Sequence, residues 1–383
     1  MKRLPHVALL IETSRSYTRG VLAGVRQYIS EHGPWSVFME LRALDSPEPR
    51  WLKHWRGDGI LTRTNGRSMA AAVRAAGVPA VELRATKLGL NLPFVGVDNQ
   101  AIGRMVAEHL LDRGFRRFGF YEFDTEDYFE QRRDNFLETL RRAGCPCDVF
   151  CAGRRETPAE WERQQDQLVG WVARLEKPVG LMACTDQLGF WLLDACKRAG
   201  VAVPEEAAVV GVENEEALCS MSSPPLSSVQ FNGELIGHTA ASMLDRLMAG
   251  RSLRRRRVLV EPLGVVTRQS SDIVALEDAD LAAALRYIRQ HACAGATVDD
   301  VLRQVPVSRS KLERGLREAT GRSPHAEILR VRLERVRQLL LETDLPLAAI
   351  AARCGFNHPQ YLCEVFRKHF QRSPGDYRAA ARG

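Results

Sequence analysis

The sequence between residues 5 and 268 repeats one pattern, in which a short apolar run is followed by a stretch with helical periodicity. The first such pair predicts a strand over residues 6–11 and a helix over residues 17–31. Short apolar strands that alternate with amphipathic helices are typical of a parallel sheet covered by helices on both faces. The pattern therefore predicts an α/β fold for this part of the chain.

The alternation restarts after residue 113, which divides the α/β part into two lobes in series. Open parallel sheets bind ligands at the carboxyl ends of their strands, so two such lobes predict a ligand-binding cleft. We expect further strands at residues 36–41, 59–62, 80–83, 94–97, 117–121 and 208–212 and around Val149 and Gly180, and further helices at residues 49–55, 69–76, 99–113, 132–143 and 186–199.

The last quarter of the chain, residues 281–383, has a different pattern. It contains two helix-turn-helix cores, at residues 297–319 and 347–370, joined by an amphipathic helix over residues 324–341. This quarter has 18 Lys and Arg against 10 Asp and Glu, whereas the whole chain has a net charge of +7, so the net positive charge is confined to it. Two recognition helices on one basic all-α domain suit the reading of adjacent major-groove segments of double-stranded DNA.

In the first motif, Ser308 is the expected N-cap of the recognition helix, and Leu312 and Leu316 are expected to point inward. Arg314 can bind guanine as a fork, and Glu313 can accept a hydrogen bond from a cytosine amino group. Arg309 and Arg317 are expected to hold phosphates. The residues that face outward are Arg309, Ser310, Glu313, Arg314 and Arg317.

In the second motif, Gly355 can supply the positive φ of the turn, and Pro359 suits the first turn of the recognition helix. Gln360 and Glu364 are candidates for base contacts, although Glu364 can also orient a neighbouring side chain. An exposed face without a role in DNA binding is the alternative for the whole set. The outward positions are His358, Gln360, Cys363, Glu364, Arg367 and Lys368, of which Arg367 and Lys368 are expected on phosphates.

The length of 383 residues is too great for one core. We expect a sensor at residues 1–268, a polar and acidic linker at residues 269–280, and the DNA-binding domain beyond it. The chain has no run of eighteen apolar residues, and its first apolar run is too short for a signal segment, so we expect neither a membrane span nor secretion. Nine irregularly spaced cysteines are typical of reduced thiols in a cytoplasmic protein.

Cys145, Cys147 and Cys151 form the densest cysteine group, which leaves metal binding or redox sensing open. No paired CxxC motif or nearby His completes a tetrahedral set of ligands, so we expect no metal site. The enzymatic alternative is a cysteine that takes up a methyl group from alkylated DNA. Cys184 beside Asp186 lacks the surroundings that activate a thiolate, so we expect neither catalytic residues nor enzymatic activity.

Several segments of the α/β part resemble the sugar-sensing domain of the LacI/GalR repressors and the periplasmic sugar-binding proteins. The resemblance implies a two-lobed periplasmic-binding-protein-like sensor of type I, in which the chain crosses between the lobes near residues 98–106 and 229–233. The matching segments are residues 7–24, FVGVDNQAIGRMVAEHLLDRGFRRFGF from Phe94, RRDNFLETLRRAG from Arg132, CTDQ at residues 184–187, VVGVENEE at residues 209–216 and PLSSV at residues 225–229.

The resemblance also implies which residues contact the effector. A sugar presents hydroxyl groups to carboxylates, amides and Arg, and its C–H faces stack on aromatic rings. Asp98 and Asp186 can instead be helix N-caps, Arg132 can belong to a solvated face, and Trp161 can be ordinary packing. Glu213 stands where the family usually has Asp, which leaves the identity of the sugar open. The implied positions are Ser14, Arg15, Ser16, Tyr17, Asp98, Arg132, Trp161, Thr185, Asp186 and Glu213.

The second helix-turn-helix motif resembles the signature of the AraC/XylS transcription regulators, on residues Ile350, Ala351, Gly355, Phe356, Tyr361, Phe366, Phe370, Pro374, Tyr377 and Arg378. A LacI-like sensor ahead of an AraC-type domain resembles, nearly end to end, the arrangement of the xylose operon regulators. That resemblance implies a cytoplasmic homodimer that binds operator DNA, acts with RNA polymerase as an activator of a pentose operon, and uses no cofactor. The implied effector is D-xylose or another pentose. The alternatives are a repressor released by its ligand, or a sensor of a purine, a polyol or a phosphorylated sugar.

Overall fold

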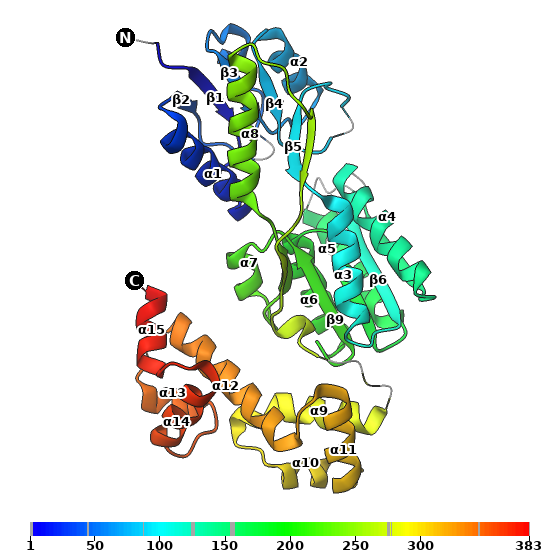
Figure 1. The fold of residues 1–383 in the computed structure, drawn as a ribbon. Coiled ribbons are helices and arrows are strands. Elements are labelled where there is room, and N and C mark those ends of the chain that lie inside the picture. The colour runs from blue at the N-terminus through cyan, green and yellow to red at the C-terminus, as the bar shows by residue number, and fades with distance from the viewer. Residues whose placement is uncertain are drawn as a thin grey trace. The chain divides into compact units, whose positions relative to one another are not determined.

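The computed structural model describes residues 3–43, 46–86, 88–123, 127–153, 158–273, 276, 278–343 and 345–382. The chain forms two compact units, Met1–Asp272 and Ile273–Gly383, and each is described by itself (Figure 1). Among the described residues, the helices are all too short or too polar to cross a membrane.

The first lobe of the N-terminal unit is a six-stranded sheet in the order β11-β5-β4-β3-β1-β2, with all its strand pairs parallel. Its apolar core lies between the sheet and the segments that follow β2 and β3, and includes Leu10, Leu52, Ile60 and Val73. Helices α1 (Ser16–His32) and α8 (Gly233–Met248) pack along each other, as Figure 1 shows. The other elements are β1 (His6–Leu10), β2 (Ser36–Met39), η1 (Arg50–His54), β3 (Gly59–Thr62), α2 (Arg67–Ala75), β4 (Ala80–Glu82), β5 (Phe94–Val97) and β11 (Arg257–Val260).

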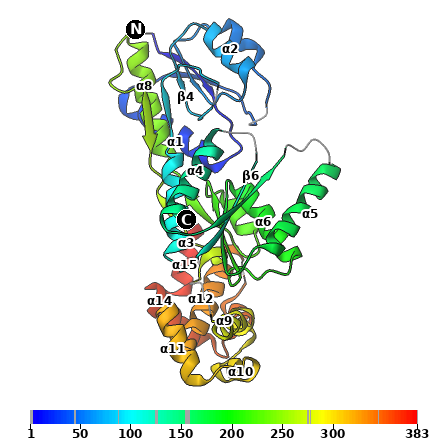
Figure 2. The same ribbon diagram turned by 90° about the vertical axis from the view of Figure 1, so that its right-hand side faces the viewer.

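The second lobe has a six-stranded sheet in the order β12-β10-β9-β8-β6-β7. Its strand pairs are parallel except for β10 and β12, which run antiparallel. Helix α3 packs on α4 and α5 packs on α6, and Figure 2 shows the two pairs on opposite sides of the sheet. The elements are α3 (Asn99–Leu111), β6 (Arg117–Phe123), α4 (Asp127–Arg142), β7 (Cys147–Ala152), α5 (Pro158–Arg174), β8 (Val179–Ala183), α6 (Asp186–Arg198), β9 (Ala207–Val212), α7 (Glu216–Met221), β10 (Ser227–Gln230), β12 (Gly264–Val266) and η2 (Gln269–Ser271).

The chain passes between the two lobes three times: after β5, after β10, and between β11 and β12. The first two passages lie near the crossings expected at residues 98–106 and 229–233. The third, at residues 261–263, was not expected, because no sequence pattern shows that β11 and β12 belong to different sheets. Three connecting segments cross at one junction, and such a junction can act as a hinge about which the lobes move as rigid bodies.

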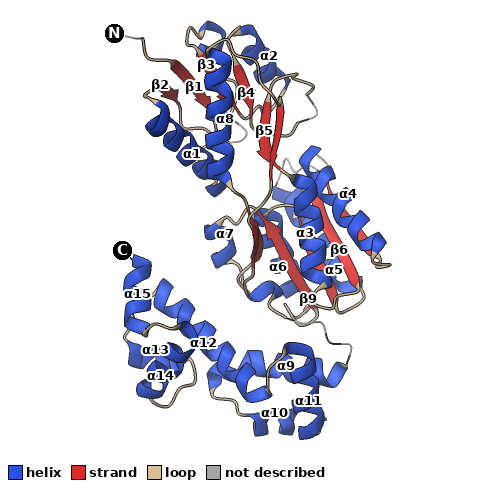
Figure 3. Ribbon diagram, viewed as in Figure 1, coloured by secondary structure: helices blue, strands red, loops and turns tan. Residues whose placement is uncertain are grey.

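The C-terminal unit contains helices only, as Figure 3 shows. Two local caps begin its first helix-turn-helix motif: Thr297 and Asp300 form a capping box, and Ser308 accepts a hydrogen bond from the Lys311 N–H. Its second half is built on the apolar cluster of α12, α13 and α14, in which Val336 and Phe366 are fully buried. The helices are α9 (Ala279–His291), η3 (Ala292–Ala294), α10 (Val298–Gln304), α11 (Arg309–Thr320), α12 (Pro324–Glu342), α13 (Leu347–Arg353), α14 (Pro359–Phe370) and α15 (Pro374–Arg382).

The structure confirms the expected fold class, a two-lobed α/β sensor followed by an all-α domain with two helix-turn-helix motifs. The expected linker needs correction at both ends. Ser270 and Ser271 are fully buried in the second lobe, where Ser270 binds the backbone of β9 and β10, and α9 already begins at Ala279. A polar sequence therefore does not by itself mark a linker, because buried hydroxyl groups can bond to backbone at strand ends. Residues 274, 275 and 277 of that segment lie outside the described residues.

Candidate functional site: effector cavity and DNA-binding helices

A cavity of about 450 Å³, partly open to solvent, lies between the two lobes of the sensor. This figure includes space that is open to solvent, so the enclosed part of the cavity is much smaller. Strand ends of both lobes contribute to its wall, as expected for a cleft between two parallel sheets. The described residues that line it are Arg15, Tyr17, Arg63, Leu83, Arg84, Ala85, Phe94, Gly96 and Val97 from the first lobe, and Asn99, Tyr128, Arg132, Glu213 and Phe231 from the second.

An ion pair spans the cavity from one lobe to the other. Arg15, which follows β1, donates from Nη1 to both carboxylate oxygens of Glu213, which follows β9, at 2.9 and 2.8 Å. The carboxylate of Glu213 raises the pKa of Arg15, so the guanidinium stays charged. Glu213 has a φ of +113°, a conformation that costs a non-glycine residue about 1–3 kcal/mol. The structure therefore holds this carboxylate toward Arg15 at a cost in backbone strain.

A second set of contacts joins the lobes beside this ion pair. The Ser16 N–H and hydroxyl donate to Glu215 at 2.5 and 2.8 Å, and Arg19 donates to the same carboxylate at 3.2 Å. Burial raises the pKa of Glu215, but the bonds from Ser16 and the charge of Arg19 outweigh it, so the pKa is lowered. Both carboxylates after β9 are therefore bonded to the first turn of α1 or the residue before it.

The wall of the first lobe presents Arg63 against Tyr17. The Arg63 Nε lies 2.8 Å from a carboxylate oxygen of the buried Glu12, and its guanidinium carbon lies 5.0 Å from the centre of the Tyr17 ring. Burial lowers the pKa of Arg63, but the charge of Glu12 outweighs it and the net direction is upward. Behind this wall, burial raises the pKa of Glu82 to about 7, although three backbone N–H groups donate to it.

The wall of the second lobe is organised by Arg132 on α4. Its Nε donates to Asn99 Oδ1 at 2.9 Å, and its Nη1 donates to the carbonyl of Cys184 at the end of β8. The guanidinium carbon lies 5.0 Å from the ring centre of Tyr128 and 5.6 Å from that of Phe231. Cation–π contacts of this kind hold an arginine in one place. Arg132 is thus a fixed, buried donor at the cavity and not part of a solvated face.

The cavity brings together four of the ten residues predicted to contact the effector: Arg15, Tyr17, Arg132 and Glu213. It also contains lining residues that the sequence reasoning missed, among them Arg63, Asn99, Tyr128 and Phe231. Asn99 and Phe231 lie within the two predicted crossings between the lobes, at residues 98–106 and 229–233, and this position was a usable signal. Arg63 and Tyr128 carried no such signal, because they come from a strand end and a helix that are not adjacent in sequence.

The other six predicted residues do not line the cavity among the described residues. Asp98 caps α3 by accepting from the Gln100 and Ala101 N–H groups, and Thr185 caps α6. Asp186 is buried, where its carboxylate accepts hydrogen bonds from Ser228 Oγ at 2.5 Å and from the Glu215 N–H at 2.6 Å. The local reasons for these polar residues are capping and loop support. Ser14 is exposed, Ser16 binds Glu215, and Trp161 lies half-buried on α5.

The first DNA-binding candidate is the exposed face of α11. Leu312 and Leu316 are fully buried beneath it, as the helical spacing predicts. The five outward residues are all exposed and surround one shallow concavity together with Glu318: Arg309, Ser310, Glu313, Arg314 and Arg317. This face therefore offers donors and acceptors suited to base edges and phosphates.

The second candidate is the exposed face of α14. Gly355 has a φ of +73°, and Pro359 occupies the first turn, as expected. Phe356 and Phe366 are buried in the apolar cluster. Tyr361 is 46% exposed, so this aromatic ring in the first turn of α14 adds to the predicted face. The exposed outward residues are His358, Gln360, Glu364, Arg367 and Lys368, with Cys363 half-buried.

Comparison with known proteins covers both units. Three family models match: the XylR N-terminal domain at residues 6–100, a periplasmic binding protein-like domain at residues 107–271, and a helix-turn-helix domain at residues 301–380. The xylose operon regulatory protein of Escherichia coli (strain K12) is 32% identical over 383 residues, which is 97% of this chain and 96% of that protein. The protein of the same name from Haemophilus influenzae is 30% identical over 380 residues, 97% of each chain.

Among solved structures, that of the xylose-binding transcription activator xylR has a TM-score of 0.81 and 30% identity, with 99% of each chain covered. These relatives are transcription regulators and not enzymes. The AraC/XylS resemblance of the second motif agrees with them. The chain therefore belongs to the family of xylose operon regulatory proteins, transcription regulators with a sugar-binding sensor ahead of an AraC-type helix-turn-helix DNA-binding domain.

Proposed function

We propose that the cavity of the sensor binds D-xylose or another aldopentose, and that the bound sugar tightens the binding of this regulator to operator DNA in the cytoplasm. The observation that carries the proposal is the Arg15 to Glu213 ion pair, which spans the cavity between the lobes. A pentose hydroxyl can donate to such a carboxylate and accept from such a guanidinium at once. Tyr17, Tyr128 and Phe231 offer apolar surfaces to its C–H groups.

The mechanism is a shift between open and closed sensor states. A ligand that contacts both lobes binds the closed state better, and it moves the equilibrium only by that difference in affinity, commonly about 1–3 kcal/mol. We propose that the chain acts as a homodimer, so that lobe closure changes the spacing of four recognition helices along the DNA. In this form it acts as an activator that contacts RNA polymerase.

The test begins with calorimetry of the full chain against pentoses, hexoses, polyols and purines. DNA is then selected from random sequence by the sugar-bound protein, and its affinity is measured with and without sugar. Arg132→Ala should lose the sugar response and keep the basal DNA affinity, because Arg132 lies at the cavity in the sensor unit. Arg132→Lys keeps the positive charge but loses the planar set of N–H donors of the guanidinium, so it should also lose most of the sugar response.

The matched control is Arg142→Ala, since Arg142 lies on the same helix with a side chain that is 74% exposed. It should respond as the unaltered protein does. Tryptophan fluorescence shows whether each variant is folded in the sensor, since all six tryptophans belong to that unit. A full response from a folded Arg132→Ala protein would contradict the assignment of the cavity.

A second candidate effector is an acidic sugar, either phosphorylated or oxidised to a carboxylate. The observation that favours it is charge: the described residues that line the cavity include four arginines, Arg15, Arg63, Arg84 and Arg132, and one carboxylate, Glu213. An anion is the complement of such a lining. Adding xylonate and a pentose phosphate to the panel separates the two candidates. Binding of the neutral pentose alone would exclude the acidic one.

A further inference from the structure

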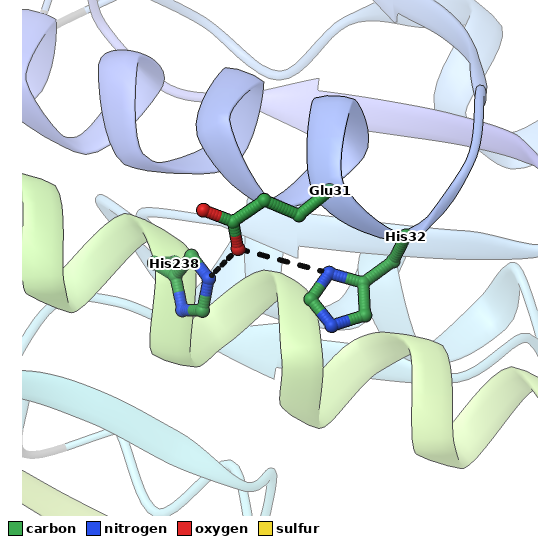
Figure 4. Close-up of side chains that lie close together, drawn as sticks. All are labelled: Glu31, His32 and His238. Atoms are coloured by element: carbon green, nitrogen blue, oxygen red, sulfur yellow. Dashed lines mark hydrogen bonds and ion pairs between the residues drawn. The ribbon is translucent and has the colours of Figure 1, made fainter.

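Three side chains with nitrogen and oxygen donors meet on the exposed side of helices α1 and α8, away from the residues that line the cavity. Glu31 and His32 are the last two residues of α1, and His238 lies in the second turn of α8 (Figure 4). Glu31 and His238 are separated by 207 residues in sequence. The helices bring them together because α1 and α8 pack along each other.

Both imidazoles lie near the same carboxylate oxygen, and His32 Nδ1 also lies 3.1 Å from the carbonyl oxygen of Tyr28, a contact that metal binding through this atom would replace. Glu31 Oε2 lies 2.9 Å from His238 Nε2 and 3.9 Å from His32 Nδ1, as the dashed lines in Figure 4 mark. One ligand atom from each of the three residues lies within 4.8 Å of the other two. A tetrahedral Zn²⁺ ion with bonds of about 2.0–2.1 Å places its ligand atoms roughly 3.4 Å apart. Small side-chain rotations close that difference, since the side chains are 30–50% exposed.

Neighbouring side chains contact all three of these ligands. Gln27 Nε2 donates to Glu31 Oε1 at 2.8 Å, which leaves Oε2 turned toward the imidazoles. The His32 ring stacks on Tyr28, with ring centres 4.1 Å apart and planes inclined by 11°. The Tyr28 ring also meets His238 edge-on at 5.3 Å. Metal ligands in proteins are characteristically held by a second set of contacts of this kind.

An ordinary surface ion pair explains only part of this arrangement. Glu31 and His238 would form such a pair by themselves, and pairs of this kind contribute little to stability. The pair does not account for the Gln27 bond that fixes the other oxygen. The contact of His32 Nδ1 with the Tyr28 carbonyl oxygen, at 3.1 Å, holds the second imidazole beside the same carboxylate. Two imidazoles and one carboxylate are a ligand set that Zn²⁺ and its neighbours among the first-row metals bind.

We propose that Glu31, His32 and His238 bind one divalent transition-metal ion of the Zn²⁺ class, with the remaining positions filled by water. The ion takes the place of the contact that Glu31 and His238 now make directly. Because the ligands come from two helices, the ion fastens the end of α1 to α8. It acts at a site separate from the effector cavity, so it does not depend on which sugar is bound.

The test uses the untagged full chain and Co²⁺, whose visible spectrum reports its ligands. One equivalent should bind and give bands of nitrogen and oxygen coordination, without the intense ultraviolet band of thiolate coordination. Zn²⁺ should displace it and raise the unfolding temperature of the sensor measured by tryptophan fluorescence. His238→Gln and His32→Gln should each abolish the Co²⁺ spectrum. Gln27→Ala should weaken binding about 10-fold or more, as loss of an outer-shell contact does.

Two controls separate this site from others. His54→Gln changes another exposed histidine of the same lobe and should leave the Co²⁺ spectrum unchanged. A variant with Cys145, Cys147 and Cys151 all changed to Ser should also bind as before. A thiolate spectrum that disappears in this cysteine variant, unchanged binding by His238→Gln, or no saturable binding at millimolar Co²⁺ would each overturn the proposal.

Discussion

Glu327 is the most heavily paired carboxylate of the DNA-binding unit. Its side chain has no exposed surface, and it lies 2.9 Å from Arg322, 2.7 Å from Arg330 and 3.7 Å from Arg289. Burial raises the pKa of Glu327, but the hydrogen bonds and charge of Arg330 and the other arginines outweigh it and lower the pKa to about 2. This one residue holds the start of α12 to α9 and to the turn after α11.

We predict that Glu327→Ala destabilises the DNA-binding unit by about 3–5 kcal/mol, because it removes a fully buried carboxylate that Arg289, Arg322 and Arg330 share. Hydrogen exchange of α12 peptides in the full chain measures the change. Glu334→Ala on the same helix is the control. The side chains of Glu334 and its partner Arg337 are 48% and 36% exposed, so this ion pair should contribute under about 1 kcal/mol to stability. Equal effects of the two substitutions would contradict the role of burial.

The same carboxylate gives a pH dependence. Because the folded pKa of Glu327 is depressed, its contribution is complete above its unfolded pKa of about 4.3 and is lost as the pH falls toward about 2. The protection of α12 peptides should therefore decline across that window in the unaltered protein. In Glu327→Ala the free energy of unfolding should depend less steeply on pH across this window, because about one fewer proton is taken up on unfolding.

At the scale of elements, the packing of α1 on α8 depends on two glycines. A Cβ at Gly24 would lie 1.9 Å from the carbonyl oxygen of Glu234, and a Cβ at Gly237 would lie 1.9 Å from that of Val21. Real atoms do not approach so closely, so any larger residue must push the helices apart. Tyr17, in the first turn of α1, and Phe231, just before α8, line the cavity, so the spacing of the helices also positions the site.

We predict that Gly24→Ala lowers the stability of the sensor by about 1–3 kcal/mol, the usual cost of overpacking. Gly170→Ala on α5 is the matched control, because a Cβ there meets nothing within 4 Å. That substitution should instead stabilise by up to about 1 kcal/mol through helix propensity. Urea unfolding followed by tryptophan fluorescence measures both. A neutral or stabilising Gly24→Ala would show that the helices separate without cost.

At the scale of the whole molecule, the two recognition helices are predicted to share the reading of one operator. Arg314→Ala should reduce the free energy of DNA binding by about 1–3 kcal/mol and relax the choice of base at one position. Arg367→Ala should weaken binding to all sequences alike and reduce the slope of log affinity against log salt concentration by about 1. Fluorescence anisotropy with selected DNA at several salt concentrations measures both. Arg251→Ala, an exposed arginine of the sensor, is the control and should change neither quantity.

The sequence predicted elements more reliably than contacts. The strands at residues 59–62 and 94–97 and the exposed faces of α11 and α14 agree with the structure residue by residue, because periodicity is a local property. Helices α5 and α8 were not predicted, and the expected helix at residues 49–55 is the short 3-10 helix η1. Gly233 and Gly237 in the first turns of α8 weaken its helical pattern.

The site divides in the same way. Asp98 and Thr185 follow strands and precede helices, so their sequence positions suit a cap as well as a ligand contact, and the structure places them as caps. Arg15 and Glu213 were predicted through the resemblance, but their ion pair required the two lobes to be placed. Arg63 and Tyr128 entered the cavity only with the structure.

The sequence by itself determined the order of most helices and strands, the confinement of the net positive charge to the last quarter, and the outward faces of two recognition helices. These follow from spacing within a few turns of the chain. Only the tertiary structure decided which polar residues form the cavity, that Glu213 pairs with Arg15, and that Glu31 and His32 meet His238 207 residues away. Such contacts depend on how whole lobes and helices pack, and no local pattern encodes a distance between residues so far apart.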